Sequence, residues 1–446
     1  MSAPAPVTAG PAPLPRNTGF RLLWVGEGVS VLGAMTTTVV VPLLAVTTFD
    51  AGPGWMGVLS AAAWLPWLLV GLPAGAWVDR LDPRRVMIAA DLAAALTTAS
   101  VPVAWALHAL TLTHLAVAAL LTGTCSVFFR TAYGSVVPRV VRPEDLDAAN
   151  GRLYGTESAM QVAGPGLGGL LVQLVGGAFA LLADTLSFLV SAVCLWRIPT
   201  RALQVVERPP ARSLRRDVAE GVRVVARDPH LRFFTLQGAA SNFALTGYGA
   251  LLVLHLVRDL DVGPGAVGAV MAVGSVGGLL GAVVANRLSA RLGGARAMRW
   301  LQVLGGPTAL LVGAGSPGAG IALVALGTIL VGTGVVGANV IRSAFRQRWV
   351  PPHLLGRTLS ASSVLNFGTM PFAGLAAGWL GAHLGIRETI LLMAGVHAVA
   401  SLWVLVGPYG RGRDLPAGQM PREDAAQDSG RWSSGSTATA RKTTVT

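Results

Sequence analysis

The sequence predicts an all-α integral membrane protein of about twelve transmembrane helices, arranged as two similar six-helix bundles. Three observations lead to this fold class. Only 12% of the 446 residues are charged and 52% are hydrophobic, whereas soluble domains carry about 25% charged residues. The apolar residues form stretches of roughly 20, the length that crosses a hydrocarbon core of about 30 Å. Finally, arginines gather in every second connection between these stretches.

The apolar stretches define the predicted elements in chain order. In the first half they cover 20–46, 55–78, 86–107, 113–136, 152–174 and 177–196. In the second half they cover 231–256, 265–286, 297–314, 319–341, 358–382 and 387–407. We expect each helix end to fall within about four residues of these limits.

The predicted organisation is two bundles, 20–196 and 231–407, joined by a polar, Arg-rich cytoplasmic loop at 197–230. The flanking segments 1–19 and 408–446 are rich in small, polar or proline residues, a composition typical of disorder. We expect both of these segments to be disordered and cytoplasmic.

Arginine placement predicts the orientation in the cell membrane. One set of connections holds Arg80, Arg84, Arg85, Arg139, Arg142, Arg208, Arg212, Arg215, Arg216, Arg287, Arg291, Arg296, Arg299, Arg346, Arg348 and Arg357. In the other set, Arg258 and Arg387 each lie beside acidic residues. Because cytoplasmic connections of membrane proteins carry the excess of basic residues, we assign both termini and the central loop to the cytoplasm.

Composition argues against several other functions. The net charge of +13 follows from these loop arginines, so it requires no nucleic-acid partner. Lys442 is the only lysine, so the chain lacks the lysine of an ATP-binding P-loop. Cys125 and Cys194 lie in apolar stretches without neighbouring metal ligands. We therefore expect no enzyme activity, no metal and no cofactor.

The two halves resemble each other. Asp79-Arg80 recurs as Asn286-Arg287, Val137-Pro138 as Val350-Pro351, and Gly151-Arg152 as Gly356-Arg357, and Gly169 recurs as Gly374. Parallel repeats of six helices are one plan of secondary transporters, whose substrate site lies between the halves near the middle of the membrane. This pattern predicts a transporter.

The loop after the second span carries the most informative motif. Gly75, Asp79, Arg80, Arg84 and Arg85 match the pattern G-x-x-x-D-R-x-G-x-R-R, with Asp82 in place of the second glycine. This segment resembles the loop 2–3 signature of the major facilitator superfamily. The interpretation is a cytoplasmic gate in which Gly75 permits tight helix packing and Asp79 lies at the positive N-terminal end of a helix starting near Gly356. The alternative is anchoring of the loop by its arginines alone.

The fifth span carries a second motif, Gly164-Pro165-Gly166-Leu167-Gly168-Gly169. It resembles the helix-5 antiporter signature of drug-exporting members, which ends in G-P-x-x-G-G, and Gly164, Pro165, Gly168 and Gly169 match it. Such residues favour a close, pliable contact between the halves. Ordinary packing of small residues is the alternative explanation.

Further segments are similar to drug:proton antiporters of the macrolide-efflux and enterobactin-exporter type. They are Phe20–Gly33, Val137–Asn150 and Ala183–Phe188, although Ala34 stands where many members carry an acid. The resemblance implies multidrug or antibiotic efflux by proton antiport with alternating access. A siderophore exporter, an importer and a non-transporting sensor remain alternatives.

Acids within the membrane are costly and therefore indicate function. Glu27 and Asp184 are candidates for proton coupling, because a carboxyl group removed from water readily holds a proton; a structural hydrogen bond is the alternative. Arg130 is a candidate for proton relay or for a gate ion pair. Glu157 is expected to pair with Arg130 or Arg152 in the cytoplasmic gate.

Several tryptophans could line a substrate cavity, and Trp24, Trp64 and Trp67 are the candidates. The expected partners are a small-molecule substrate, protons and membrane lipids. We expect the transporter to act as a monomer.

Overall fold

The computed structural model describes residues 13–78, 80–199, 214–406, 415–416 and 418–420. Within them the regular structure is helical. The first half contains α1 (Thr18–Phe49), α2 (Pro53–Leu69), α3 (Gly71–Val78), α4 (Pro83–Ala106), α5 (Leu112–Val140), α6 (Leu146–Val175) and α7 (Gly177–Arg197). The second contains α8 (Leu214–Arg227), α9 (Pro229–Leu254), α10 (Pro264–Leu292), α11 (Gly294–Gly305), α12 (Leu310–Gly313), α13 (Ile321–Trp349), α14 (Pro352–Gly368), α15 (Met370–Leu384) and α16 (Ile386–Leu402).

Nine helices within the described ranges are long and apolar enough to cross a membrane. The other three predicted spans are each divided, into α2 and α3, α11 and α12, and α14 and α15. Pro73, Pro307 and Pro371 lie at or near the breaks, where proline removes a backbone N–H and weakens the helical ladder. The helical membrane fold is therefore confirmed, and the count of twelve spans remains a prediction.

Local sequence explains where several helices begin. The side chains of Asn17, Asp82 and Asp228 each accept a hydrogen bond from a backbone N–H in the first turn of α1, α4 and α9. The helices α2, α4, α9, α10 and α14 also carry proline in the first turn, where its missing N–H costs nothing.

Helices at the arginine-rich end are longer than predicted. Helix α6 begins at Leu146 rather than 152, and α10 ends at Leu292 rather than 286. Helix α13 ends at Trp349 rather than 341, and α14 begins at Pro352 rather than 358. The expected precision of about four residues was wrong here, because these helices continue with polar residues beyond the apolar stretch that hydropathy detects.

The segment between the halves, expected to be a loop, contains helix α8. It packs on α14, where Glu220 Oε1 lies 2.7 Å from Arg357 Nη1. Gly221 lies against the Arg357 carbonyl, so a β-carbon would not fit there. The disorder predicted for 1–19 and 408–446 falls largely on residues outside the described ranges.

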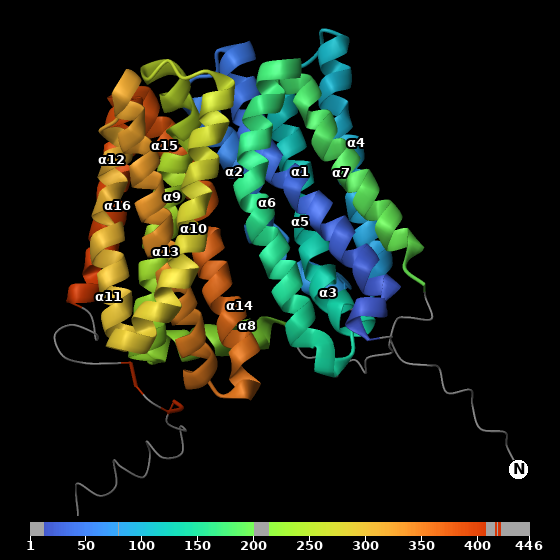
Figure 1. Ribbon diagram of the computed structural model, residues 1–446, viewed down its shortest axis with the longest axis vertical. Helices are drawn as coiled ribbons and strands as arrows, with labels where there is room; N and C mark the ends of the chain where they lie inside the picture. Colours follow the sequence, from blue (N-terminus) through green and yellow to red (C-terminus); the bar gives the residue numbers. More distant parts are fainter. Residues whose placement is uncertain (1–12, 79, 200–213, 407–414, 417, 421–446) are drawn as a thin grey trace, which may run out of the picture.

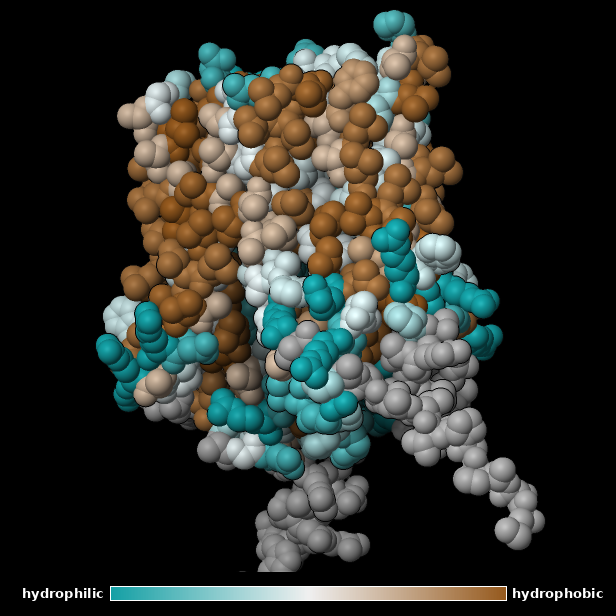
Figure 2. Space-filling model, turned by 45° about the vertical axis from the view of Figure 1, so that its right-hand side comes forward, coloured by the Kyte–Doolittle hydropathy of each residue, from teal (hydrophilic) through white to brown (hydrophobic). Residues whose placement is uncertain are grey.

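Two bundles lie side by side in Figure 1, with α1–α7 toward the right and α9–α16 toward the left. Figure 2 shows a broad hydrophobic belt on the visible face and hydrophilic side chains gathered at the lower end. The ends of α4, α5, α10 and α13 that carry arginines lie at this lower end.

The hydrophobic core is organised differently at the two ends. At the upper end of Figure 1, one cluster unites both halves, including Leu43 and Leu44 of α1 and Leu251 and Leu254 of α9. At the arginine-rich end, the N-terminal bundle has its own cluster around Phe20. The C-terminal bundle has a separate one around Phe345. The halves are therefore packed together chiefly at the end away from the arginines.

Candidate functional site

A small cavity within the N-terminal bundle is lined by charged side chains from three helices. Glu27 lies on α1, Asp91 on α4 and Arg130 on α5, and the hydroxyl residues Ser30 and Ser126 complete its polar lining. Its volume is about 70 Å³, well below the roughly 300–1,000 Å³ of sites that bind drug-sized ligands. The cavity therefore suits protons and water rather than a drug-sized molecule.

Glu27 presents a carboxylate oxygen without a partner. Its Oε2 is buried and makes no hydrogen bond within the described part of the chain. An unpaired carboxylate is costly inside a protein, and a bound proton or water removes much of that cost. This geometry fits the sequence prediction of a proton-coupling group, although the coupling itself stays a prediction.

Asp91 is a second such carboxylate, and it was not among the residues predicted for the site. Its side chain is 2% exposed, and its Oδ2 also lacks a hydrogen-bond partner among the described residues. The signal was available, since Asp91 lies within the predicted span 86–107 and acids within spans indicate function.

Arg130 pairs with Glu157, which is one of the two partners expected for that acid. Its Nη2 lies 3.1 Å from Glu157 Oε1, joining α5 to α6. Arg130 also lines the cavity that contains Glu27. It therefore belongs both to the ion pair with Glu157 and to the lining of the cavity.

Asp184 lies apart from this cavity lining and its carboxylate is satisfied. Thr37 Oγ1 donates to its Oδ2 at 2.6 Å, and Ser187 Oγ donates to its Oδ1 at 3.2 Å. Gly33 lets α1 approach α7 at this point, because a β-carbon there would overlap Asp184 and Ser187. The arrangement favours the structural alternative for this acid.

The described residues of the loop motif make separate contacts, and the predicted latch stays a prediction. Asp79 lies outside the described residues. Arg84 Nε donates to the Leu195 carbonyl at 2.8 Å and its Nη2 to the Trp196 carbonyl, so it caps the end of α7. Arg85 Nε lies 3.6 Å from Asp82 at the surface, and Arg80 is exposed.

The tight packing expected at Gly75 is not seen among the described residues. A β-carbon at Gly75 would meet none of their atoms within 4 Å. Asp82, which departs from the family pattern, accepts from Arg84 N at 3.1 Å and caps α4. A local helix cap thus replaces the glycine of the pattern.

The helix-5 motif makes close contacts on both sides of α6. Gly164 and Gly168 face α1, where a β-carbon at Gly168 would lie 2.7 Å from the Thr36 carbonyl oxygen. Gly169 faces α10 of the other half, where a β-carbon would lie 2.7 Å from Gly268 Cα. Gly268 also approaches the Pro165 carbonyl oxygen, so the motif forms a backbone contact between the two bundles.

An equivalent contact joins α2 to α15. A β-carbon at Gly57 would lie 2.8 Å from Gly378 Cα, and one at Gly374 would lie 3.0 Å from the Gly57 carbonyl oxygen. Gly374 is the repeat counterpart of Gly169.

An ion pair lies at the same end of the molecule. Arg258, which follows α9, binds the carboxylate and carbonyl of Asp50 at the end of α1. These contacts close the end opposite the arginine-rich one.

The tryptophan candidates lie outside the lining of the small cavity. Trp24 Nε1 donates to Thr156 Oγ1 at 2.7 Å. Trp64 stacks on Phe367 of α14 with ring centroids 6.1 Å apart, and Trp67 contacts the same ring at 5.5 Å. Trp64 and Trp67 therefore contact the other half near the break between α2 and α3, and their role in substrate binding stays a prediction.

Two helical bundles with a glycine-rich interface and buried acids in one of them define a multi-pass membrane transporter. The family model described as "Transmembrane secretion effector" matches residues 8–414. The chain belongs to this family of the major facilitator superfamily, which confirms the resemblance found in its motifs.

Relatives and solved structures agree with this assignment. The chain is 28% identical over 359 residues to the multidrug efflux pump Tap of Mycolicibacterium fortuitum, covering 77% of this chain and 86% of the relative. It is 24% identical to macrolide efflux protein A of Streptococcus pyogenes, covering 53% of this chain and 58% of that one. A bacterial homologue of the iron transporter ferroportin in an inward-facing state has the same fold, with a TM-score of 0.67 at 20% identity over 89% of this chain and 98% of that chain.

Proposed function

We propose that this transporter exports an amphipathic small molecule, such as a drug, an antibiotic or a natural product, in exchange for protons. The observation that carries the proposal is the cavity shared by Glu27, Asp91 and Arg130. The relatives named as multidrug and macrolide efflux proteins support the direction and the substrate class.

The mechanism follows from the charges around the cavity. Two carboxylates so close in a low-dielectric interior repel each other, and protonation relieves the repulsion. Arg130 is held by Glu157 in this conformation. In the proposed cycle, Arg130 leaves Glu157 and approaches Glu27 when the cavity loses its proton. Substrate and proton are proposed to bind in alternation.

Alternating access is proposed from the contacts between the halves. The glycine contacts of α6 with α10 and of α2 with α15 close one end, while the cores at the arginine-rich end are separate. With about twelve spans and the arginine-rich end in the cytoplasm, this conformation is closed to the outside. Rocking of the bundles that separates these contacts would open the outer side. A siderophore exporter of the same fold remains the alternative.

The test is Glu27→Gln in the purified protein reconstituted into proteoliposomes. We expect transport of a lipophilic dye or a macrolide driven by a pH gradient to fall by more than about tenfold, because glutamine cannot carry the proton. Substrate binding measured without a gradient should stay largely intact. Wild-type transport that shows no dependence on the pH gradient would refute proton coupling.

A further inference from the structure

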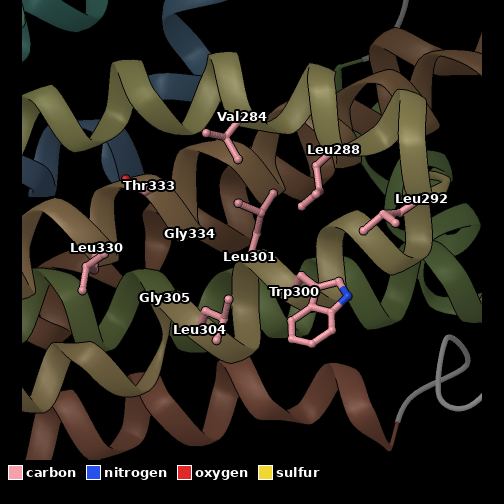
Figure 3. Close-up of a pocket in the computed structure, with 10 residues that line it drawn as sticks. All are labelled: Val284, Leu288, Leu292, Trp300, Leu301, Leu304, Gly305, Leu330, Thr333 and Gly334. Atoms are coloured by element: carbon pink, nitrogen blue, oxygen red, sulfur yellow. The ribbon is translucent and has the colours of Figure 1, made fainter.

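A larger, apolar groove lies on the C-terminal bundle between α10, α11 and α13 (Figure 3). Its volume is about 430 Å³, within the range of roughly 300–1,000 Å³ for sites that bind small ligands. Trp300 and Leu304 on its rim are 54% and 62% exposed, so the groove opens to the surroundings of the bundle. In a membrane protein those surroundings are lipid.

The groove has a structural cause in the crossing of its helices. Gly305 and Gly334 bring the backbones of α11 and α13 together, since a β-carbon at Gly305 would lie 2.8 Å from Gly334 Cα. Gly281 likewise brings α10 close to Thr333 and Gly337 of α13. Side chains away from these crossing points diverge and leave a hollow between them.

The lining offers apolar contacts along its length. Figure 3 shows Leu288, Leu292 and Trp300 toward one end and Leu330 toward the other. Thr333 also lines the groove, but its hydroxyl donates to the Ile329 carbonyl at 2.8 Å. The groove therefore suits a hydrocarbon chain better than a polar ligand.

A cluster of arginines lies at the open end of this groove. Residues 281–305 contain Arg287, Arg291, Arg296 and Arg299 and no acidic residue. Arg296 precedes Trp300 by four residues, so it lies on the same face of α11, nearer the N-terminal end of that helix. Arg291 follows Leu288 by three residues on α10, and both arginines are exposed.

We propose that the groove binds one acyl chain of an anionic phospholipid, whose phosphate lies at Arg291 and Arg296. From Leu292 to Val284 the groove follows α10 for roughly 12 Å, close to the half-thickness of about 15 Å of a hydrocarbon core. Guanidinium groups bind phosphate in two-pronged geometry, and basic residues at the cytoplasmic surface attract anionic lipids. Trp300 lies toward the same end of the groove, and tryptophan is enriched at membrane–water interfaces.

The test measures lipid retained by the full-length protein in detergent, by native mass spectrometry, with phosphatidylglycerol and phosphatidylcholine as the probes. We expect the phosphatidylglycerol complex to be the tighter one. R291Q/R296Q should weaken it by about fivefold for each arginine removed and leave phosphatidylcholine unchanged. R291K/R296K, which keeps the charges, should retain most of the preference.

Two comparisons make the result decisive. R139Q/R348Q removes the same charge from other helix ends, and we expect it to leave phosphatidylglycerol binding unchanged. Leu304→Trp fills the groove and should reduce phosphatidylglycerol retention with all arginines present. An equal loss in R139Q/R348Q would show a diffuse charge effect and overturn the proposal. Full retention in R291Q/R296Q or in Leu304→Trp would overturn it as well.

Discussion

Single residues show how acids with similar sequence contexts differ in their surroundings. Glu27, Asp91 and Asp184 all lie within predicted spans. Asp184 accepts hydrogen bonds from Thr37 and Ser187, whereas Glu27 and Asp91 each keep a buried oxygen without a partner among the described residues. A satisfied carboxylate stabilises the packing of two helices, and an unsatisfied one has a reason to bind a proton.

Asp91→Asn tests this distinction. We expect it to reduce transport driven by a pH gradient by about tenfold, because the amide removes one of the two groups able to carry the proton. The pH dependence of the remaining transport should also change. Asp184→Asn is the comparison, and we expect it to lower the thermal unfolding midpoint while the pH dependence of transport persists. The reverse pattern would assign proton coupling to Asp184.

At the scale of elements, glycines set the distance between helices of opposite halves. Gly57 and Gly54 both lie on α2, but only the former faces the backbone of α15. A β-carbon at Gly54 would meet open space. The same residue type on one helix therefore has two different roles.

Gly57→Val should disfavour the conformation seen here, since overpacking of a close contact costs about 1–3 kcal/mol. We expect labelled sites at the upper ends of α2 and α15 to separate in distance measurements by electron paramagnetic resonance. Gly54→Val is the matched control and should leave these distances unchanged. Identical distance distributions in both variants would contradict a role of this contact in closing the halves.

Arg84 of the loop motif binds the C-terminal end of α7, and a substitution of Arg84 tests this role. Its hydrogen bonds to the last carbonyls of α7 should stabilise the protein, and charge at a helix C-terminus contributes about 0.3–1 kcal/mol more. We therefore expect Arg84→Gln to lower the thermal unfolding midpoint in detergent. Arg85→Gln removes only a surface pair with Asp82 and should have little effect. Equal midpoints for the two variants would count against the cap.

At the scale of the whole molecule, the halves are held at one end by glycine contacts and by the pair of Asp50 with Arg258. The Asp50 side chain is 93% exposed, and exposed ion pairs contribute about 0.2–1 kcal/mol. Backbone contact at the glycines is therefore the stronger restraint.

Arg258→Gln should shift the population of closed molecules by no more than about fivefold, as this small energy implies. The same distance measurement at the upper ends of the bundles checks it. Asp50→Asn should give a similar shift, and combining both substitutions should add little because they remove one interaction. A shift larger than that of Gly57→Val would reverse the ranking of the two contacts.

The sequence by itself determined the helical membrane fold, the approximate positions of the apolar helices and the transporter family. Apolar stretches of hydrocarbon length and motifs such as Gly164–Gly169 are local patterns, so they can be read without a structure. It also indicated Glu27 as a candidate for proton coupling, because an acid in an apolar stretch is visible locally.

Only the tertiary structure decided which acids share a cavity, which glycines touch the opposite half and where helices continue past the apolar stretches. Asp91 approaches Glu27 because α4 packs against the same bundle core as α1, a relation between residues 64 positions apart. A β-carbon at Gly75 would meet no atom of the described residues within 4 Å, although its motif predicted packing. Whether a buried acid finds hydrogen-bond partners, and whether a glycine lies against another helix, depends on residues distant in sequence. A local sequence pattern therefore cannot predict either.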